Sequence, residues 1–283
     1  MELRCVASRE GRLSSFLKEE LKMSTGLMNK LKWGDAIQVN GTPQHTDFLV
    51  QIADEITVRL DEAAPEYPAE QGDLTVLWED DHILVVDKPA GMLIHPSHSQ
   101  NTGTLANIVA GYFAETGQQS AFHPVTRLDR DTFGVVLLAK NAHIHTLLQN
   151  TLVEKIYHAL VFGGPETDGG LIDAPIARRP LPSLLRYISP EGKPSQTEFR
   201  VLQRREMTTL LALRPITGRT HQLRLHCAHM GWPILGDPQY GCEESQAYSR
   251  NLGYEYQRLC AKELHFSHPI TGEEIHICSH LNP

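Results

Sequence analysis

The sequence has little that would place it in a membrane or outside the cell. It contains five cysteines among 283 residues, and none of them forms a C-x-x-C pair. Such scattered cysteines are typical of reduced thiols in a cytoplasmic protein. No apolar run reaches the roughly 18 to 20 residues that a membrane-spanning helix needs, and the N-terminus lacks the apolar segment of a secretory signal. We therefore expect a cytoplasmic protein with no membrane contact.

The sequence also lacks the common signatures of nucleotide and metal sites. The glycine-rich turn at 163–170 has no G-x-G-x-x-G pattern and no helix after it. His143 and His145 lie two residues apart in a predicted helix, where side chains at that spacing do not face each other. No carboxylate or third histidine completes a site beside them. We expect no cofactor and no metal.

Composition predicts a folded protein with an uneven charge distribution. Hydrophobic residues make up 41% of the chain, enough for a packed core, and the length suggests about two domains. The formal net charge of −8 argues against nucleic acid as a partner. Residues 121–230, however, hold 14 Lys and Arg against 9 Asp and Glu. A local basic cleft can attract a phosphate backbone even when the whole chain is acidic.

Residues 1–60 have the pattern of a small separate module. Apolar residues recur at helical spacing from Leu13 to Leu21. Ser24 or Thr25 can cap a second helix, and Asn40-Gly41 is a strong hairpin signal. Residues 61–73 follow; they are acidic, contain two prolines and a glycine, and indicate a linker. Residues 74–283 form the second predicted domain.

The densest charged motif of that domain is His123–Lys140, HPVTRLDRDTFGVVLLAK. The apolar run from Gly134 predicts a buried strand, so Asp129 lies on a loop at the mouth of that strand. A carboxylate there needs a paired cation, and neighbouring guanidinium groups favour its ionised form. Such a group can act as a nucleophile or a general base. For this motif alone, a solvated and salt-bridged surface turn is the alternative.

The motif closely resembles the Arg-Leu-Asp-x-x-Thr-x-Gly signature of the RluA-type pseudouridine synthases. Three more segments follow in the family's order: KIYHALV, TGRTHQLR and GWPILGDPQYG. The resemblance implies an α+β fold with a large mixed, mainly antiparallel sheet flanked by helices and loops. It also implies that Asp129 is the catalytic residue and that Tyr157 stacks on the target base. Thr126 and Phe133 replace the family's usual His and Ser, which suggests a sub-branch with a different RNA target.

Arg219 is the residue that we expect to pair with Asp129, because a guanidinium can hold a carboxylate bidentately and keep it ionised. We expect His221 and Arg224 to serve helix packing or phosphate contacts instead. Leu264 is expected to pack against the base. The predicted substrate and RNA contacts of this domain are Arg127, Arg130, Thr132, Lys88, Lys193, His221, Gln222, Arg224 and Leu264.

The N-terminal module looks like an S4 RNA-binding domain, on the segments RLSSFL, STGLMNKLK, IQVNG and DEITV. This resemblance implies that Arg12, Lys18 and Lys30 meet an RNA backbone. Ordinary solvated helix faces are the alternative, because residues 1–60 hold 8 basic and 8 acidic side chains.

Together the resemblances imply isomerisation of uridine to pseudouridine in a structured RNA. Asp129 would either attack C1′ or remove a proton from C2′. Large-subunit ribosomal RNA is the expected substrate, with tRNA as the alternative, and we expect a monomer. Two competing hypotheses remain: a catalytically silent S4 RNA-binding protein, and a hydrolase that releases free uracil.

Overall fold

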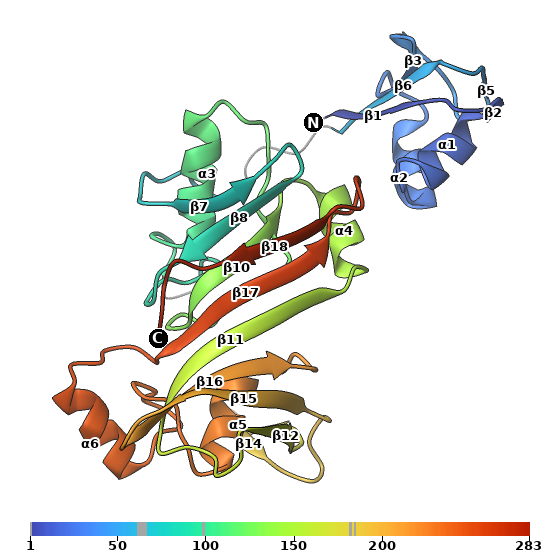
Figure 1. Ribbon diagram of the computed structural model, residues 1–283. Helices are drawn as coiled ribbons and strands as arrows, with labels where there is room; N and C mark the ends of the chain where they lie inside the picture. The colour runs from blue at the N-terminus through green and yellow to red at the C-terminus, as the bar shows by residue number, and fades with distance from the viewer. Residues whose placement is uncertain (1, 61–66, 98–99, 181–182, 184) are drawn as a thin grey trace.

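The computed structural model describes residues 2–60, 67–97, 100–180, 183 and 185–283 (Figure 1). Its N-terminal module comprises β1 Glu2–Val6, β2 Gly11–Arg12, α1 Leu13–Glu19, α2 Thr25–Leu31, β3 Ile37–Val39, β4 Thr42–Pro43, β5 Leu49–Val50 and β6 Glu55–Arg59. Four of these strands form a sheet in the order β1-β6-β3-β4, and β2 pairs with β5.

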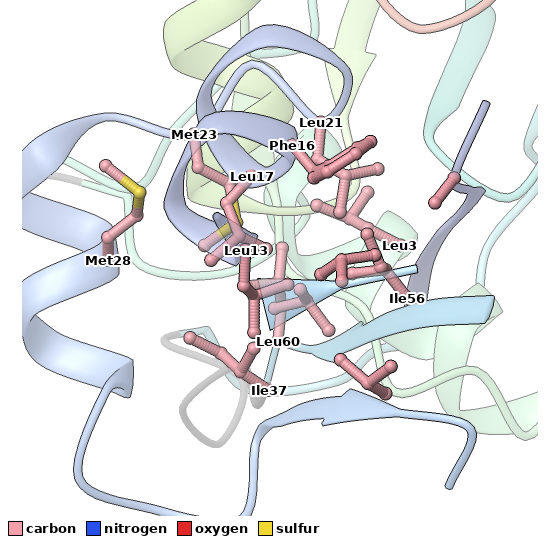
Figure 2. Close-up of a cluster of buried hydrophobic side chains, with 14 residues drawn as sticks. Leu3, Leu13, Phe16, Leu17, Leu21, Met23, Met28, Ile37, Ile56 and Leu60 are labelled. Carbon is pink, nitrogen blue, oxygen red and sulfur yellow. The ribbon is translucent and has the colours of Figure 1, made fainter. Parts of the chain in front are cut away.

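The packing of this module confirms its predicted helix pair and hairpin. Figure 2 shows apolar side chains of the helices and the sheet meeting in one core, in which Leu13 and Phe16 are buried. Ser24 caps α2 by accepting a hydrogen bond from the Leu27 amide at 3.1 Å. Asn40 and Gly41 have φ values of 51° and 75°, and they turn β3 into β4.

The second domain is built on one ten-stranded sheet. Its strands are β7 Thr75–Glu79, β8 Ile83–Lys88, β9 His123–Pro124, β10 Phe133–Ala139, β11 Val153–Phe162, β12 Gly169–Asp173, β15 Gln196–Arg204, β16 Thr208–Pro215, β17 Leu259–Ser267 and β18 Glu274–Cys278. The main order is β12-β15-β16-β11-β17-β10-β8-β7, with β18 beside β17 and β9 beside β10. Only β10 and β17 pair in parallel among the described strands. The predicted α+β fold with a mixed, mainly antiparallel sheet is confirmed.

Helices cover both faces of this sheet (Figure 1). Alternate residues of β8 and β10 pack in two different cores: Val85 and Leu137 lie with Ile144, whereas Val86 and Leu138 lie with Val109. Strands buried on both faces read as continuous apolar runs, as these two do. The remaining elements are α3 Leu105–Glu115, α4 Ala142–Gln149, α5 Gln222–His229, α6 Glu243–Asn251 and the hairpin of β13 Ile176–Arg178 and β14 Arg186–Ile188.

Part of the predicted linker is packed against the second domain. Residues 61–66 lie outside the described residues. The main chain after them follows α3: the Glu70 amide donates to the Asn107 carbonyl at 3.0 Å, and the Asn107 side chain donates to the Pro68 carbonyl at 3.0 Å. A Cβ on Gly111 would lie 2.1 Å from the Glu70 carbonyl oxygen, so glycine permits this close approach. Residues 67–73 are therefore bound to α3 rather than linking freely.

The module also contacts the sheet domain directly. His143 on α4 forms a hydrogen bond with the Leu21 carbonyl oxygen at 3.1 Å. Ile270 packs against the module core and against the core under α4. His143 therefore serves a contact between the module and the sheet domain. No helix in the described ranges has both the length and the apolar character that crossing a bilayer requires.

The centre of the sheet brings the Asp129 loop beside Tyr157. Gly134 on β10 and Tyr157 on β11 both have Ala261 of β17 as their register partner. Gly134 has a φ of 109°, and a Cβ on it would lie 2.3 Å from the Ala261 carbonyl oxygen. Only glycine combines this backbone conformation with this approach. The loop that ends at Gly134 is thereby held against β17, whose other neighbour, β11, carries Tyr157.

Candidate active site

A cleft of about 720 Å³ opens where the Asp129 loop, β11 and the start of α5 meet. Its lining includes one acidic side chain, that of Asp129, and several basic ones. The basic lining residues are Arg127, Arg130, Lys155, Arg219 and Arg224. The acidic protein therefore carries a basic cleft, as the charge distribution predicts, and such a cleft attracts a polyanion.

The backbone around Asp129 is fixed by hydrogen bonds from three sides. The Thr132 amide donates to the Asp129 carbonyl oxygen at 3.2 Å, which closes a tight turn. The buried Thr132 hydroxyl accepts a hydrogen bond from the Gln257 side chain. The Lys88 ammonium group donates to the Arg130 carbonyl at 3.0 Å. The loop therefore presents the Asp129 side chain in one position.

Arg224, and not Arg219, is the cation that binds Asp129. Its Nη1 donates to Asp129 Oδ2 at 3.1 Å. The other side of the guanidinium forms a bidentate pair with Asp237, with Nε–Oδ2 at 2.7 Å and Nη2–Oδ1 at 2.8 Å. Burial alone would lower the pKa of Arg224, but the hydrogen bonds and charges of Asp237 and Asp129 raise it above its ordinary value. Arg224 is therefore a permanent buried cation between two carboxylates.

The predicted Arg219–Asp129 pair is wrong because Arg219 precedes α5. Its side chain is exposed, and its Nε donates to the Pro194 carbonyl at 3.2 Å. Arg224 lies one turn inside the helix, three residues after His221, and residues at that spacing share a face. Gln222 is buried and holds the turn before the helix, since its Oε1 accepts from the Arg219 amide at 3.0 Å. Gln222 also lines the cleft, and its RNA contact stays a prediction.

His221 lies on the other side of Asp129 Oδ2. Its Nε2 is 3.8 Å from that oxygen, and its Nδ1 is 2.9 Å from the Tyr240 hydroxyl oxygen. Burial lowers the pKa of His221 and outweighs the neighbouring Asp129 charge, so the ring is neutral at neutral pH. The Tyr240 ring in turn lies 5.1 Å from the Arg224 guanidinium carbon, a cation–π contact. The side chains of α5 thus form one network with Asp129.

Tyr157 and Lys155 enter the cleft from the same face of β11, as residues two apart on a strand do. Burial raises the pKa of Tyr157 well above its ordinary value, and the Asp129 charge adds to this effect. The phenol therefore stays protonated. Burial also lowers the pKa of Lys155. The structure thus brings Asp129, Tyr157 and Arg224 together in one cleft.

Lys88 does not reach the surface, so its predicted phosphate contact is wrong. Its side chain is fully buried, and its Nζ donates to the carbonyl oxygens of Pro89, Met92 and Arg130 at 2.9, 2.9 and 3.0 Å. Burial lowers its pKa to about 7, against the charges of Asp131 and Asp129. Lys88 ties the end of β8 to the Asp129 loop.

The other predicted contacts divide into exposed and buried side chains. Arg127 and Arg130 are exposed at the cleft, and Arg130 also pairs with Asp131 at 2.8 Å. Lys193 is exposed on a turn but is not among the cleft-lining residues. Leu264 is buried in the core under α4 and is also absent from the lining, so it does not face a base here. Arg12, Lys18 and Lys30 are exposed on the N-terminal module.

Sequence reasoning gave no role to Asp237, Tyr240 or Lys155. All three lie inside motifs that the sequence analysis singled out, GDPQY and KIY. The i, i+3 spacing of His221 and Arg224 was the available signal that these two act together. Asp237 could be found only through the fold, because it is buried 13 residues after its partner in the turn that follows α5.

A carboxylate, a buried arginine and a tyrosine ring thus line one basic cleft. Residues 82–229 match the family model described as RNA pseudouridylate synthase. The chain belongs to this family, and it is an RNA pseudouridine synthase of the RluA type.

Three relatives illustrate the similarity. An uncharacterized RNA pseudouridine synthase of Bacillus subtilis (strain 168), YlyB, is 37% identical over 84% of this chain and 80% of its own. Ribosomal large subunit pseudouridine synthase D of Pseudomonas aeruginosa is 38% identical over 75% and 69% of the two chains. The structure of human RNA pseudouridylate synthase domain containing 1 covers 75% of this chain and 84% of its own, with a TM-score of 0.61 and 25% identity.

Proposed function

We propose that Asp129 is the catalytic carboxylate of this synthase and that Arg224 positions it. The observation that supports this proposal is that the two carboxylate oxygens of Asp129 have different hydrogen-bond partners. Oδ2 accepts the hydrogen bond from Arg224 at 3.1 Å, and Oδ1 accepts none from the described residues. One oxygen is therefore held in place while the other is free to meet the sugar.

The target uridine has to leave its stack before it can enter the cleft, at a cost of a few kcal/mol. We propose that Tyr157 receives the flipped base, since an aromatic ring recovers roughly 1–3 kcal/mol by stacking on a base. Tyr157 lines the cleft from β11, and the nearby Asp129 charge helps to raise its pKa. This arrangement would set C1′ of the ribose over the free carboxylate oxygen.

Asp129 would then assist the breaking of the N1–C1′ bond, either by adding to C1′ or by taking a proton from C2′. Both routes begin with the same unshared oxygen. An electron-poor sugar beside a carboxylate is the situation that glycosidases also exploit. The uracil leaves with the N1–C1′ electron pair, rotates and bonds to C1′ through C5. In this step either the Asp129–C1′ bond breaks or Asp129 returns its proton to C2′. The proton on C5 is lost to solvent and N1 takes up a proton, so that the product is an isomer of the substrate.

RNA binding is proposed to come from two surfaces. Arg127, Arg130 and Arg219 are exposed around the cleft, where they can contact phosphates on either side of the flipped nucleotide. The N-terminal module is proposed to be S4-like, with Arg12 and Lys18 among its exposed cations. Its helix pair, followed by a hairpin, supports that assignment.

We propose large-subunit ribosomal RNA as the substrate. The support is the printed name of the Pseudomonas aeruginosa relative, a ribosomal large subunit pseudouridine synthase. tRNA is the alternative. We propose that the protein acts as a monomer and that it acts in the cytoplasm.

The test of the active-site assignment is Asp129→Asn, with Asp131→Asn as the matched control. We expect Asp129→Asn to lower the rate of pseudouridine formation by at least about 10²–10⁴-fold while RNA affinity changes little. Asp131→Asn should stay within about tenfold of the wild type. Equal activity of Asp129→Asn and the wild type would contradict the assignment, and release of free uracil would favour a hydrolase.

The substrate is tested separately by mapping pseudouridines in cells with and without the gene. Loss of positions in large-subunit ribosomal RNA would support the proposal, and loss only in tRNA would replace it. A wild-type protein that binds RNA but forms no pseudouridine in any RNA would be a silent binding protein.

A further inference from the structure

The terminal hairpin carries a second cluster of reactive side chains. Glu263 and His265 lie two apart on β17, and His276 and Cys278 lie two apart on β18. The antiparallel register sets Glu263 opposite Cys278 and His265 opposite His276. Residues at these positions project from one face of the two strands. Four side chains that commonly bind metals therefore meet on a single hairpin.

The spacing of three of them matches the edges of a tetrahedral zinc site. Ligand atoms at 2.0–2.3 Å from a central zinc ion are separated by about 3.3–3.6 Å from one another. Glu263 Oε2 lies 3.2 Å from His276 Nε2, and Cys278 Sγ lies 3.4 Å from the same nitrogen. The ligand atoms of Glu263, His276 and Cys278 all lie within 4.8 Å of one another. The His265 ring is stacked on the His276 ring with their centroids 3.7 Å apart, so it flanks this group without pointing a nitrogen at the same ion.

The cluster lies on the opposite side of the sheet from the catalytic cleft. Leu264 and Phe266 point from β17 into the core under α4, so Glu263 and His265 between and beside them point the other way. The side chain of His276 is 49% exposed, and a metal ion can reach it from solvent. The site therefore shares no residue with the proposed reaction.

We propose that Glu263, His276 and Cys278 bind one zinc ion. Thiolate and imidazole ligands favour zinc over magnesium or calcium, which prefer oxygen ligands. One thiolate and one carboxylate balance the 2+ charge of the ion. Three protein ligands leave one of the four tetrahedral positions for water. The ion would join β18, the edge strand, to β17 and stabilise the strand that also carries Ala261 between Tyr157 and Gly134.

This inference departs from the sequence expectation of no metal, which rested on the spacing of His143 and His145 and on the lack of a carboxylate or third histidine beside them. The signal in the sequence is an E-x-H segment followed by an H-x-C segment across a tight hairpin. Each segment alone is unremarkable as a metal motif. Only the register of the hairpin brings the two pairs together.

The experiment is a titration of metal-stripped full-length protein with Zn²⁺ against a chromogenic chelator, followed by Co²⁺ substitution. We expect one equivalent of tightly bound Zn²⁺, and a thiolate-to-Co²⁺ charge-transfer band in the near ultraviolet. Cys278→Ser and His276→Gln should weaken Zn²⁺ binding by more than the roughly 10–100-fold that is typical of changes outside the ligand set. Cys278→Ser should also lose the band.

The matched control is Cys242→Ser, because Cys242 is the other exposed free cysteine and serine can replace it at the N-cap of α6. This variant should keep both the Zn²⁺ affinity and the Co²⁺ band. Added Zn²⁺ should raise the Tm of the wild type and of Cys242→Ser but not that of Cys278→Ser. Unaltered pseudouridine formation by Cys278→Ser would show that this variant is folded.

Two results would overturn the proposal. One is the absence of stoichiometric Zn²⁺ binding by the wild type in the presence of the chelator. The other is Zn²⁺ binding and a Co²⁺ band that are the same in Cys278→Ser as in the wild type. Neither result would bear on the role of Asp129.

Discussion

The catalytic cleft and the N-terminal module both carry basic side chains, but the two sets are held in different ways. At the cleft Arg224 is buried and bound to Asp129, and beneath the Asp129 loop Lys88 is buried and bound to the Arg130 carbonyl. On the module, Lys18 and Lys30 are exposed on two short helices whose stability comes from the apolar core beneath them. A buried cation fixes geometry, because its removal leaves partners unpaired. An exposed cation adds long-range attraction and little stability.

The largest effect is expected where a buried cation is removed. Arg224→Met leaves Asp237, whose side chain is 1% exposed, without its partner. Losing one member of a buried pair typically costs about 3–5 kcal/mol, so the free energy of unfolding should fall by that amount. The exposed control is Arg214→Met, whose pair with Glu198 lies on the surface. It should cost at most about 1 kcal/mol in denaturant unfolding. Equal losses of unfolding free energy in Arg224→Met and Arg214→Met would mean that the buried and the exposed ion pair do not differ in their contribution to stability.

A buried lysine should also make stability depend on pH. Burial lowers the pKa of Lys88 from 10.5 to about 7. Between these values the unfolded chain holds a proton that the folded protein does not. The Lys88 contribution to stability therefore falls as the pH drops from 10.5 to 7 and is constant below 7.

We expect the unfolding free energy of the wild type to rise relative to that of Lys88→Met as the pH rises from 7 to 10. The shift should be at most about 1.4 kcal/mol per pH unit. Urea unfolding at three pH values measures it, with exposed Lys18→Met as the control. A difference that does not change with pH would mean that the Lys88 pKa is not shifted.

The smallest effect is expected on the module. The double variant Lys18→Ala/Lys30→Ala should bind RNA a few-fold more weakly, with a shallower dependence of log affinity on log salt, by about 0.7–0.9 per lost phosphate contact. Turnover of bound RNA should not change. Arg205→Ala, in the turn between β15 and β16 and absent from the cleft lining, controls for the loss of one exposed positive charge. An unchanged salt dependence in the double variant would argue against RNA contact by this module.

The same contrast explains which parts of the molecule could be predicted from the sequence. The Ser24 cap and the Asn40-Gly41 turn depend on contacts between near neighbours, and both were predicted correctly. Strand β1 was not predicted, because its five residues include the charged Glu2 and Arg4, and its partner β6 is far away in the sequence, with pairs from Glu2–Arg59 to Val6–Glu55. Helix α6 was also missed. Its sequence EESQAYSRN has no apolar stripe, and the residues that it buries are the small polar Ser245 and Ser249.

Key residues of the cleft were predicted from the sequence, but the ion pair between Asp129 and an arginine was predicted with the wrong arginine. Asp129 and Tyr157 could be assigned by resemblance, and both line the cleft. Which arginine meets Asp129 depends on where α5 begins and on a carboxylate, Asp237, in a later turn. Lys88 was misjudged for a related reason: a lysine at the end of a strand reads as exposed unless the loop that covers it is known. Long-range packing decides both cases.

The most direct test of the account compares Arg224→Lys with Arg219→Lys in single-turnover pseudouridine formation at saturating enzyme. Lysine keeps the charge but cannot reproduce the fork that joins Asp129 to Asp237. We predict that Arg224→Lys slows the chemical step by about 10²-fold or more, whereas Arg219→Lys stays within about threefold of the wild-type rate. A slow Arg219→Lys variant beside a wild-type-like Arg224→Lys variant would contradict the claim that Arg224 holds the catalytic carboxylate.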